Sequence, residues 1–437
     1  MVWFYDFVFL VFALVSIPKF LVRLKQTNDQ KRLLRERFGF LPEALKEKCD
    51  GKQVIWLHAV SVGEVMAARS WIELFSQKYP DWVIALSVTT PTGHSVAQSL
   101  TFDQLVVFYA PFDLSGVVRR AIVAIRPRLI LLMETEIWPN LILGAVRARI
   151  PVGIINGRIS PRSFRRYQLV QPVVASLLKR LSFCSVQSER DQKYFLELGM
   201  PSSKMICTGN MKFDFLKKVE SFASGEGFFQ NLKSEKGLVL VGGSTHWNEE
   251  ELLLHVFRQL LENFTGLKLV LAPRHPEQAR RVATAIEQNK LRYQLSSQNR
   301  SDGSYDVLLV DQIGILVSLY SLADVVFMGG SFVCRGGQNP IEAAFCEKPI
   351  LHGPNVFNFH EVYRALDERG AAFQVDSEEE LFQKLSLLFS NSGVRKQMGL
   401  EAASIVQSMQ GATMRTLEFL SSWIHDYTPS VPLSVVS

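Results

Sequence analysis

Short apolar runs alternate with helical patterns along most of the chain. Each run is rich in Val, Ile and Leu, ends in a Gly or polar turn, and is followed by residues with helical periodicity. Near-continuous apolar strands that alternate with helices are typical of parallel sheets covered on both faces. The sequence therefore predicts an α/β protein. The runs are 53–64, 81–93, 128–140, 151–158, 182–191, 237–251, 267–279, 305–314, 323–332 and 348–354.

A polar, Gly-containing stretch at residues 217–237 separates these runs into two groups of similar size. A length of 437 residues also fits two domains. We expect an N-terminal segment over 1–22, one Rossmann-like domain over 23–222 and a second over 223–437. In open α/β sheets, ligands bind at the carboxyl ends of the strands, so the turns that follow the strands are where we look for chemistry.

Residues 1–20 carry only two charged side chains, Asp6 and Lys19. Their apolar core, 7–17, is shorter than the ~20 residues that a membrane crossing needs, so it spans only if the preceding aromatic residues form an interfacial belt. Seven Lys or Arg against two acids follow between positions 19 and 37. By the positive-inside rule these cations keep the rest of the chain in the cytoplasm, and they would also bind anionic lipid. The alternatives are a buried core helix or a cleaved signal peptide.

The overall charge is modest. The chain has 48 basic and 42 acidic side chains, a net charge of +6, and the segment 19–37 alone contributes +5. This distribution argues against a nucleic-acid partner. The chain has five cysteines, an odd number, and no Cys-x-x-Cys spacing. We therefore expect neither a disulfide framework nor a structural zinc site. Since no His, Asp or Cys cluster has metal-ligand spacing either, we expect no metal.

A second basic region lies inside the first predicted domain. Between Glu136 and Glu189 the chain has no acidic residue but eight basic ones. Such a run is either a solvated face or a surface that docks anionic lipid headgroups or phosphates, for which the arginine fork is suited. The basic residues are Arg147, Arg149, Arg158, Arg162, Arg165, Arg166, Lys179 and Arg180.

Three carboxylates follow predicted strands of the first domain. Glu64 stands where a helix begins after strand 54–58, and Glu134 and Glu136 follow strand 129–133. Each could be a general base at the sheet edge or an acid in a first helical turn, which the macrodipole favours. Two carboxylates two positions apart on an extended segment point to opposite faces, so we expect at most one of that pair in a cleft.

The second domain carries three glycine-rich or polar turns. GGSTH (242–246) follows a strand and opens a helix, a geometry that binds phosphate. APRHPE (272–277) brings basic side chains to another strand end. In GGSFVCRGGQNPIEAA (329–344), Asn339 and Glu342 fit an ordinary helix-capping pattern. The surrounding glycines favour a second interpretation, in which a nucleotide approaches the backbone and Glu342 accepts hydrogen bonds from a ribose diol.

These strings resemble the Kdo transferases, which transfer 3-deoxy-D-manno-octulosonic acid (Kdo) from CMP-Kdo to lipid A precursor in lipopolysaccharide synthesis. The resemblance covers nearly the whole chain in the family's order. It implies the GT-B architecture, in which two Rossmann-like domains face each other across a cleft, with the acceptor site in the N-terminal half and the nucleotide site in the C-terminal half. The matching strings are ERFG (36–39), HAVSVGE (58–64), METEIWPN (133–140), NGRIS (156–160), TGNMKFD (208–214), GGSTH (242–246), APRHPE (272–277), GGSFVCRGGQNPIEAA (329–344) and GPNVFNF (353–359).

The resemblance also implies roles for individual residues. Glu64 would be the catalytic base, ionised at neutral pH if it kept an ordinary pKa of ~4.3, and Glu134 and Lys212 would support the transition state. One departure stands at Gln338, where the family usually has His; an amide can replace a neutral imidazole but not a cation. The implied CMP contacts are Pro273, Arg274, Gln312, Ile313, Gly314, Asn339, Pro340, Ile341 and Glu342.

The resemblance therefore implies an inverting glycosyltransferase that needs no metal or other cofactor. Its donor would be CMP-Kdo and its acceptor lipid A precursor (lipid IVA), at the cytoplasmic side of the inner membrane. The alternatives are a GT-B transferase for another nucleotide sugar, an epimerase of similar fold, or a membrane-tethered protein that binds anionic lipid without turnover.

Overall fold

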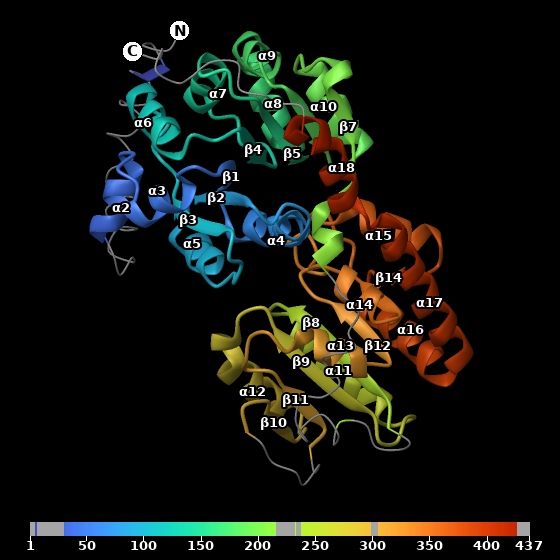
Figure 1. Ribbon diagram of the computed structural model, residues 1–437. Coiled ribbons are helices and arrows are strands. Elements are labelled where there is room, and N and C mark those ends of the chain that lie inside the picture. Colours follow the sequence, from blue (N-terminus) through green and yellow to red (C-terminus); the bar gives the residue numbers. More distant parts are fainter. Residues whose placement is uncertain (1–4, 7–29, 216–231, 233–236, 299–304, 426–437) are drawn as a thin grey trace. The chain divides into compact units, whose positions relative to one another are not determined.

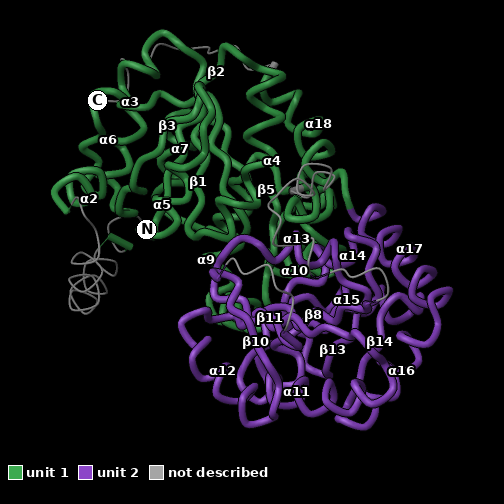
Figure 2. Tube along the Cα trace, turned by 90° about the horizontal axis from the view of Figure 1, so that it is seen from below, with its two compact units in different colours: residues 1–215, 410–437 green, residues 216–409 purple. Residues whose placement is uncertain are grey.

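The computed structural model describes residues 5–6, 30–215, 232, 237–298 and 305–425. The chain folds into two compact units (Figure 2). The first comprises the described parts of 1–215 and 410–437, and the second those of 216–409. The expected boundary at 222/223 lies outside the described residues. We expected 223–437 to form one domain, whereas the chain from Gln410 onward belongs to the first unit.

The first unit is built on a seven-stranded parallel sheet in the order β3-β2-β1-β4-β5-β6-β7 (Figure 1). The chain enters at β1, runs outward to β3 and returns to β4 on the other side of β1. The switch point, where open α/β sheets bind ligands, is therefore between β1 and β4. The strands are β1 Gln53–Ala59, β2 Trp82–Val88, β3 Leu105–Tyr109, β4 Leu129–Met133, β5 Val152–Gly157, β6 Phe183–Val186 and β7 Met205–Cys207.

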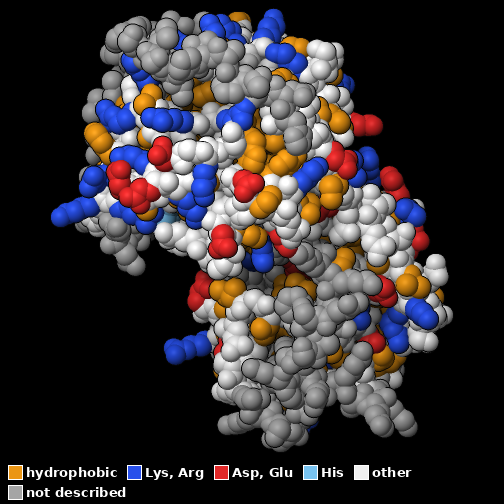
Figure 3. Space-filling view, in the orientation of Figure 1, with side chains coloured by type: hydrophobic (Ala, Val, Ile, Leu, Met, Phe, Trp, Pro, Cys, Tyr) orange, Lys and Arg blue, Asp and Glu red, His pale blue; other side chains and the backbone are white. Residues whose placement is uncertain are grey.

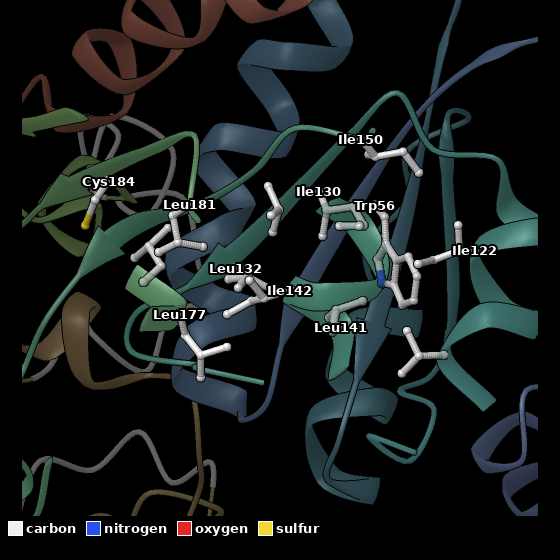
Figure 4. Packing of buried hydrophobic residues seen from close by; sticks show 14 of the residues in the cluster. Trp56, Ile122, Ile130, Leu132, Leu141, Ile142, Ile150, Leu177, Leu181 and Cys184 are labelled. Atoms are coloured by element: carbon white, nitrogen blue, oxygen red, sulfur yellow. The ribbon is translucent and has the colours of Figure 1, made fainter. Parts of the chain in front are cut away.

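Both faces of this sheet are buried, as the continuous apolar strands predict. Trp56 and Ile130 point to one face, where they pack with residues of α6, α7 and α9 (Figure 4). Ile55 and Leu131, their neighbours in sequence, pack on the other face with α4 and α18. The helices of this unit are α2 Gln30–Arg37, α3 Glu43–Cys49, α4 Val62–Lys78, α5 Pro91–Gln98, α6 Ser115–Ile125, α7 Pro139–Arg147, α8 Pro161–Leu169, α9 Gln171–Leu178, α10 Glu189–Glu197, α18 Ala412–His425, and the 3-10 helices η1 Ser202–Lys204 and η2 Met211–Phe215.

The last described helix, α18, completes the first unit. The Asp214 carboxylate accepts hydrogen bonds from the backbone N–H groups of Gly411 and Thr413, at 2.6 and 2.5 Å. Further along α18, Leu420 is fully buried and Phe419 meets the ring of Phe183 at 5.9 Å between centroids. Because α18 covers a face of the sheet that would otherwise be apolar and exposed, it packs here and not with the unit that precedes it in sequence.

The second unit repeats the plan with a seven-stranded parallel sheet in the order β10-β11-β9-β8-β12-β13-β14. The chain runs from β8 outward through β9, β10 and β11 and then returns to β12 on the other side of β8. The switch point of this sheet is therefore between β8 and β12. The strands are β8 Val239–Thr245, β9 Lys268–Pro273, β10 Tyr293–Leu295, β11 Val307–Leu309, β12 Val325–Met328, β13 Ile350–His352 and β14 Ala372–Gln374. The helices are α11 Glu249–Leu260, η5 Pro276–Gln278, α12 Ala279–Gln288, α13 Leu316–Leu322, α14 Ile341–Phe345, α15 His360–Glu368, α16 Glu378–Ser390 and α17 Ser392–Met409. The predicted pair of Rossmann-like folds is confirmed.

The predicted membrane segment, 1–22, is represented in the described residues only by Tyr5 and Asp6. The Asp6 carboxylate accepts hydrogen bonds from the backbone N–H and hydroxyl of Ser115, at 3.1 and 2.6 Å, and from Asn140 Nδ2 at 2.6 Å. Asp6 therefore contacts the N-terminal ends of α6 and α7. Within the ranges described above, no helix combines the length and the apolar character needed to cross a membrane.

The end of the basic run at 19–37 differs from our expectation of a lipid-binding segment. Arg37 is only 7% exposed, and its guanidinium donates to the carbonyl oxygens of Ala110 and Thr89. Arg32 pairs with the buried Glu36 at 2.6 Å, and the Glu36 carboxylate also accepts the backbone N–H of Tyr109. These charges fix α2 to the edge of the first sheet, so Arg37 is not available to a lipid surface.

Candidate active site

Glu64 lies at the switch point of the first sheet, in the first turn of α4. Its carboxylate accepts the backbone N–H of Val60 at 2.7 Å and the hydroxyl of Ser61 at 2.9 Å, while Ser61 Oγ accepts the Glu64 N–H at 3.4 Å. This is a reciprocal capping arrangement, so the helix-start interpretation is geometrically correct. The side chain is nevertheless in an unusual setting, because the residue is only 6% exposed.

The electrostatic surroundings of Glu64 make it a weaker acid than expected. Burial raises the pKa of the Glu64 carboxyl from 4.5 to about 7, and the charges of Glu136 and Glu134 act in the same direction. Our expectation of a carboxyl with an ordinary pKa was wrong, because the sequence does not show how far the first turn of α4 is removed from water. A carboxyl that titrates near neutral pH can accept and release a proton under working conditions.

Glu134 and Glu136 both act electrostatically on Glu64, and their segment is not the extended one that we expected. The reason is the backbone: Glu134 has a φ of +54°, so the segment turns immediately after β4 and is not extended. Glu134 Oε1 pairs with Lys212 Nζ at 2.7 Å. Glu136 accepts the indole N–H of Trp138 at 2.7 Å, and burial raises the pKa of its carboxyl.

Asn156 is a residue of this site that the sequence reasoning missed. It is the last residue but one of β5, has a φ of +55° and is fully buried. Its Oδ1 accepts the backbone N–H of Met211 at 3.0 Å. That bond fixes the start of η2, where Lys212 follows, and Asn210 Oδ1 accepts the Lys212 N–H at 3.0 Å. An Asn inside an apolar strand was the available signal, since an amide in a buried strand needs partners.

The structure thus brings Glu64, Glu134 and Lys212 together within one unit, beside Glu136. The arrangement offers one carboxyl that titrates near pH 7 and a carboxylate neutralised by an ammonium group. Such a set can take a proton from a hydroxyl and compensate charge that develops nearby. Among the residues that the structure describes, no group of three or more His, Cys, Asp or Glu is placed to hold a metal ion.

The residues implied for CMP lie at the carboxyl ends of the strands of the second sheet. Pro273 ends β9, and the Arg274 N–H donates to the carbonyl of Thr245 at the end of β8, at 2.8 Å. The turn 312–314 follows β11; there Ile313 is 88% exposed and Gly314 has a φ of +94°. All of them therefore lie on the edge where ligands of open α/β sheets bind.

The turn before α14 separates the two interpretations of Glu342. Asn339 Oδ1 accepts the backbone N–H of Ile341 at 3.2 Å, so the amide satisfies the start of the helix, and α14 begins one residue after Pro340. Glu342 Oε1 accepts only a long bond, 3.5 Å, from Asn339 Nδ2 among the hydrogen bonds of the described residues. Burial raises the pKa of Glu342. Its carboxylate is thus not the acceptor that caps the helix.

Glu249 organises this edge and was also missed, since Glu249 to Glu251 look like ordinary acids of a first helical turn. The fully buried carboxylate accepts four backbone N–H groups: His246 and Gly330 on one oxygen at 2.9 and 2.7 Å, and Ser331 and Phe332 on the other, both at 2.9 Å. It therefore ties the β8–α11 turn to the glycine-rich turn after β12. The backbones of the two turns also lie close together at Gly329, where a Cβ atom would be 2.4 Å from the Ser244 carbonyl oxygen.

Comparison with known proteins agrees with the resemblance. Residues 32–215 match the sequence profile described as 3-deoxy-D-manno-octulosonic-acid transferase (Kdo transferase). Over 412 residues the chain is 32% identical to the 3-deoxy-D-manno-octulosonic acid transferase of Haemophilus influenzae, an alignment that covers 92% of this chain and 94% of that protein. The chain belongs to the Kdo transferase family. It is therefore an enzyme, a glycosyltransferase.

A second sequence relative and a solved structure are also similar to this member of the Kdo transferase family. It is 32% identical to the 3-deoxy-D-manno-octulosonic acid transferase of Rickettsia felis, over 85% of this chain and 80% of that protein. Among solved structures, UDP-GlcNAc 2-epimerase from Neisseria meningitidis bound to UDP-GlcNAc has a TM-score of 0.59 at 15% identity, covering 84% of this chain and 99% of the epimerase. At that identity the likeness shows the fold alone, so the enzyme class comes from the sequence relatives.

Proposed function

We propose that this enzyme transfers Kdo from CMP-Kdo to a lipid A precursor, with Glu64 as the general base. The observation that carries the proposal is the buried Glu64 carboxyl, whose pKa of about 7 matches a base that works at neutral pH. In the reaction, Glu64 takes the proton from a sugar hydroxyl of the acceptor. The hydroxyl oxygen forms a bond to the anomeric carbon of Kdo on the face opposite CMP, the carbon–oxygen bond to CMP breaks, and the configuration inverts.

Glu134 and Lys212 support this step as an ion pair. Because Lys212 Nζ lies 2.7 Å from Glu134 Oε1, the ammonium group is held at a fixed place and compensates one of the two carboxylates that raise the pKa of Glu64. A fixed cation stabilises negative charge that develops as the bond to the leaving group breaks, without reorganising in the reaction. We propose that Lys212 has this role.

The donor binds to the second unit in this proposal, with the cytidine held by the turn 312–314 and the ribose by Glu342. The Asn339 cap leaves the Glu342 carboxylate as an acceptor for a ribose diol, and Arg274 lies at the end of a neighbouring strand. The leaving group, a phosphate monoester, is stabilised by cationic side chains and helix N-termini. The proposed reaction therefore uses no metal or other cofactor.

Attachment to the inner membrane, with the catalytic units on the cytoplasmic side, is also a proposal. Supporting it, the junction of α8 and α9 exposes Leu169, Val170 and Val173, at 84, 50 and 49%, next to the exposed arginines Arg165 and Arg166. Lys and Arg side chains also gather over α6 and α7 (Figure 3). Exposed apolar side chains beside cations suit an anionic lipid surface, which is where a lipid A precursor resides.

The decisive test is the identity of the nucleotide that the enzyme releases. Purified protein in detergent is incubated with lipid IVA and, in separate reactions, CMP-Kdo or UDP-GlcNAc, and the products are resolved by HPLC. Release of CMP that depends on the acceptor is expected, with no UDP. UDP release or epimerised UDP-GlcNAc would favour the other uses of this fold. Lipid binding without nucleotide release would contradict turnover of either donor.

A further inference from the structure

A cavity of about 420 Å³ lies at the switch point of the second sheet. Its walls come from the turns after β8, β9 and β12, and include His246, Trp247, His275, Arg281 and Arg335. The residues implied for CMP do not line it. Its volume is within the ~300–1,000 Å³ range of small-molecule sites. The cavity is therefore placed for a part of the donor other than the nucleotide.

The lining of this cavity is cationic. It contributes two guanidinium groups and two imidazoles, and none of its lining residues is Asp or Glu. Acids outside the lining are engaged elsewhere or act on one arginine only. The Glu249 carboxylate is saturated by backbone N–H groups, and Glu277 lies 3.3 Å from His275 at an exposed position. The buried Glu250 interacts electrostatically with Arg281, which leaves Arg335 as the arginine of the lining that faces a ligand. An excess of positive charge without a carboxylate in the wall selects an anionic ligand.

Arg281 is held in place through its side chain, and Arg335 through its backbone. The Arg281 guanidinium stacks over the Trp247 ring, 3.4 Å from its centroid, which fixes the plane of its donors. The backbone of Arg335 is fixed by its N–H bond to the Val333 carbonyl at 2.7 Å and by the bond from Asn358 Nδ2 to the Arg335 carbonyl at 2.8 Å. The Arg335 side chain itself is exposed at the cavity.

Gln338 lies outside the lining of the cavity but next to His246, which is part of it. Its amide Nε2 lies 3.4 Å from His246 Nε2, a ring nitrogen that accepts or donates according to the imidazole tautomer. Burial lowers the pKa of His246, and the charges of Arg335, His275 and Arg274 add to this. These effects disfavour the charged form of His246, and the two guanidinium groups supply the positive charge of the cavity. An amide at position 338 is compatible with this role, and a cation there is not required.

We propose that this cavity binds the carboxylate of the sugar acid in the donor, with Arg335 as the residue that selects an acidic over a neutral sugar. The inference rests on the proposed use of CMP-Kdo. That donor carries two anionic groups, the phosphate and the sugar carboxylate. The phosphate belongs with the CMP contacts, whereas the sugar extends from it along the switch point, where the cationic cavity lies.

The test separates sugar recognition from nucleotide recognition. Arg335→Gln removes the charge from an exposed side chain, and Arg364→Gln, in an exposed arginine of α15 outside the cavity, is the matched control. For each variant, the KM for CMP-Kdo is measured at saturating acceptor, and the Kd for CMP alone by calorimetric titration of the full-length protein. We expect Arg335→Gln to raise the KM at least about tenfold, as for loss of a hydrogen bond to a charged group, with the Kd for CMP unchanged within about twofold. Arg335→Lys should recover part of the loss.

An unchanged KM for CMP-Kdo in Arg335→Gln would overturn the assignment. So would an equal weakening of CMP and CMP-Kdo, because Arg335 would then bind the phosphate. A wild-type protein that binds CMP yet never consumes CMP-Kdo would instead overturn the proposed function, and the subsite with it. Melting temperatures of all variants are measured alongside, and a rise in KM that accompanies a lower melting temperature would also contradict the proposal.

Discussion

Replacing Glu64 by Gln should remove activity while stabilising the protein. The amide fits the site: its Oε1 can accept the Val60 N–H and its Nε2 can donate to Ser61 Oγ, the two partners of the native carboxylate. The start of α4 is therefore kept. The amide cannot take a proton from an acceptor hydroxyl, so kcat should fall by ~100- to 10,000-fold, the usual contribution of a general base.

The magnitude of the stabilisation follows from the raised pKa. A Glu64 pKa of about 7 in the folded state against an ordinary 4.5 means that the folded protein holds a proton that the unfolded chain releases between these pH values. Stability is therefore fully present below pH 4.5 and falls as pH rises to about 7, by about 3 kcal/mol in all. Glu64→Gln removes this loss, so the gain should approach about 3 kcal/mol at pH 8 and stay below about 1 kcal/mol at pH 5.

Differential scanning calorimetry at pH 5 and pH 8 measures this effect. For a unit of this size, each kcal/mol shifts the melting temperature by about 2–4 °C, so a gain of about 3 kcal/mol should raise the melting temperature of the first unit by about 6–12 °C at pH 8. Glu47→Gln, at an exposed position of α3, is the control and should shift neither transition. The wild-type kcat/KM should rise with pH through about 7. A variant with wild-type turnover, or one without a pH-dependent gain in stability, would refute the reasoning.

Three other changes test the donor site and the membrane segment. Glu342→Ala should weaken CMP binding at least about tenfold with little change in melting temperature, because Asn339 accepts the first N–H of α14 and Glu342 is left to bind the ribose; titration with CMP measures it. Glu249→Gln should lower the stability of the second unit by about 2 kcal/mol or more, since one amide oxygen cannot accept four N–H groups, whereas the partly exposed Glu251→Gln should not; calorimetry compares them. Deleting 1–22 should keep turnover on detergent-dispersed acceptor, cost about 1 kcal/mol through the lost Asp6 bonds, and make vesicle binding in flotation assays salt-sensitive.

Each of these predictions has an outcome that would contradict it. Intact CMP affinity with a lower melting temperature in Glu342→Ala would return Glu342 to a purely structural role. Equal stability of the Glu249 and Glu251 variants would mean that the four N–H bonds are not needed to hold the turns. If deletion of 1–22 abolished folding or detergent turnover, the segment would belong to the core of the first unit and not to a membrane anchor.

Much of the fold follows from the sequence, because parallel strands buried on both faces have a recognisable composition. The apolar runs located the strands that carry both switch points, and the carboxyl-edge rule directed attention to the turns that hold Glu64 and Glu342. The return of α18 to the first unit was not predictable, since it depends on a tertiary contact between Asp214 and the start of α18. A helix pattern alone does not show which sheet its apolar face covers.

The details of the site depend on backbone and burial that local sequence does not reveal. The left-handed conformation of Glu134 turns the chain directly after β4, and the charges of both Glu134 and Glu136 act on Glu64, which the extended-strand rule could not anticipate. Arg37 looked like part of a lipid-binding run, yet its guanidinium satisfies buried carbonyls of the first sheet. Glu249 looked like a first-turn acid. In each case, partners distant in sequence decide the role.

The central claim is tested most directly by the mass of the lipid product. Purified full-length enzyme is incubated with CMP-Kdo and lipid IVA, and the extracted lipid is analysed by mass spectrometry together with the CMP released. The account predicts a lipid whose mass has increased by one or more whole Kdo residues, one CMP for each Kdo added, and neither product with Glu64→Gln. An unchanged lipid mass with the wild-type enzyme, or CMP release without a heavier lipid, would contradict it.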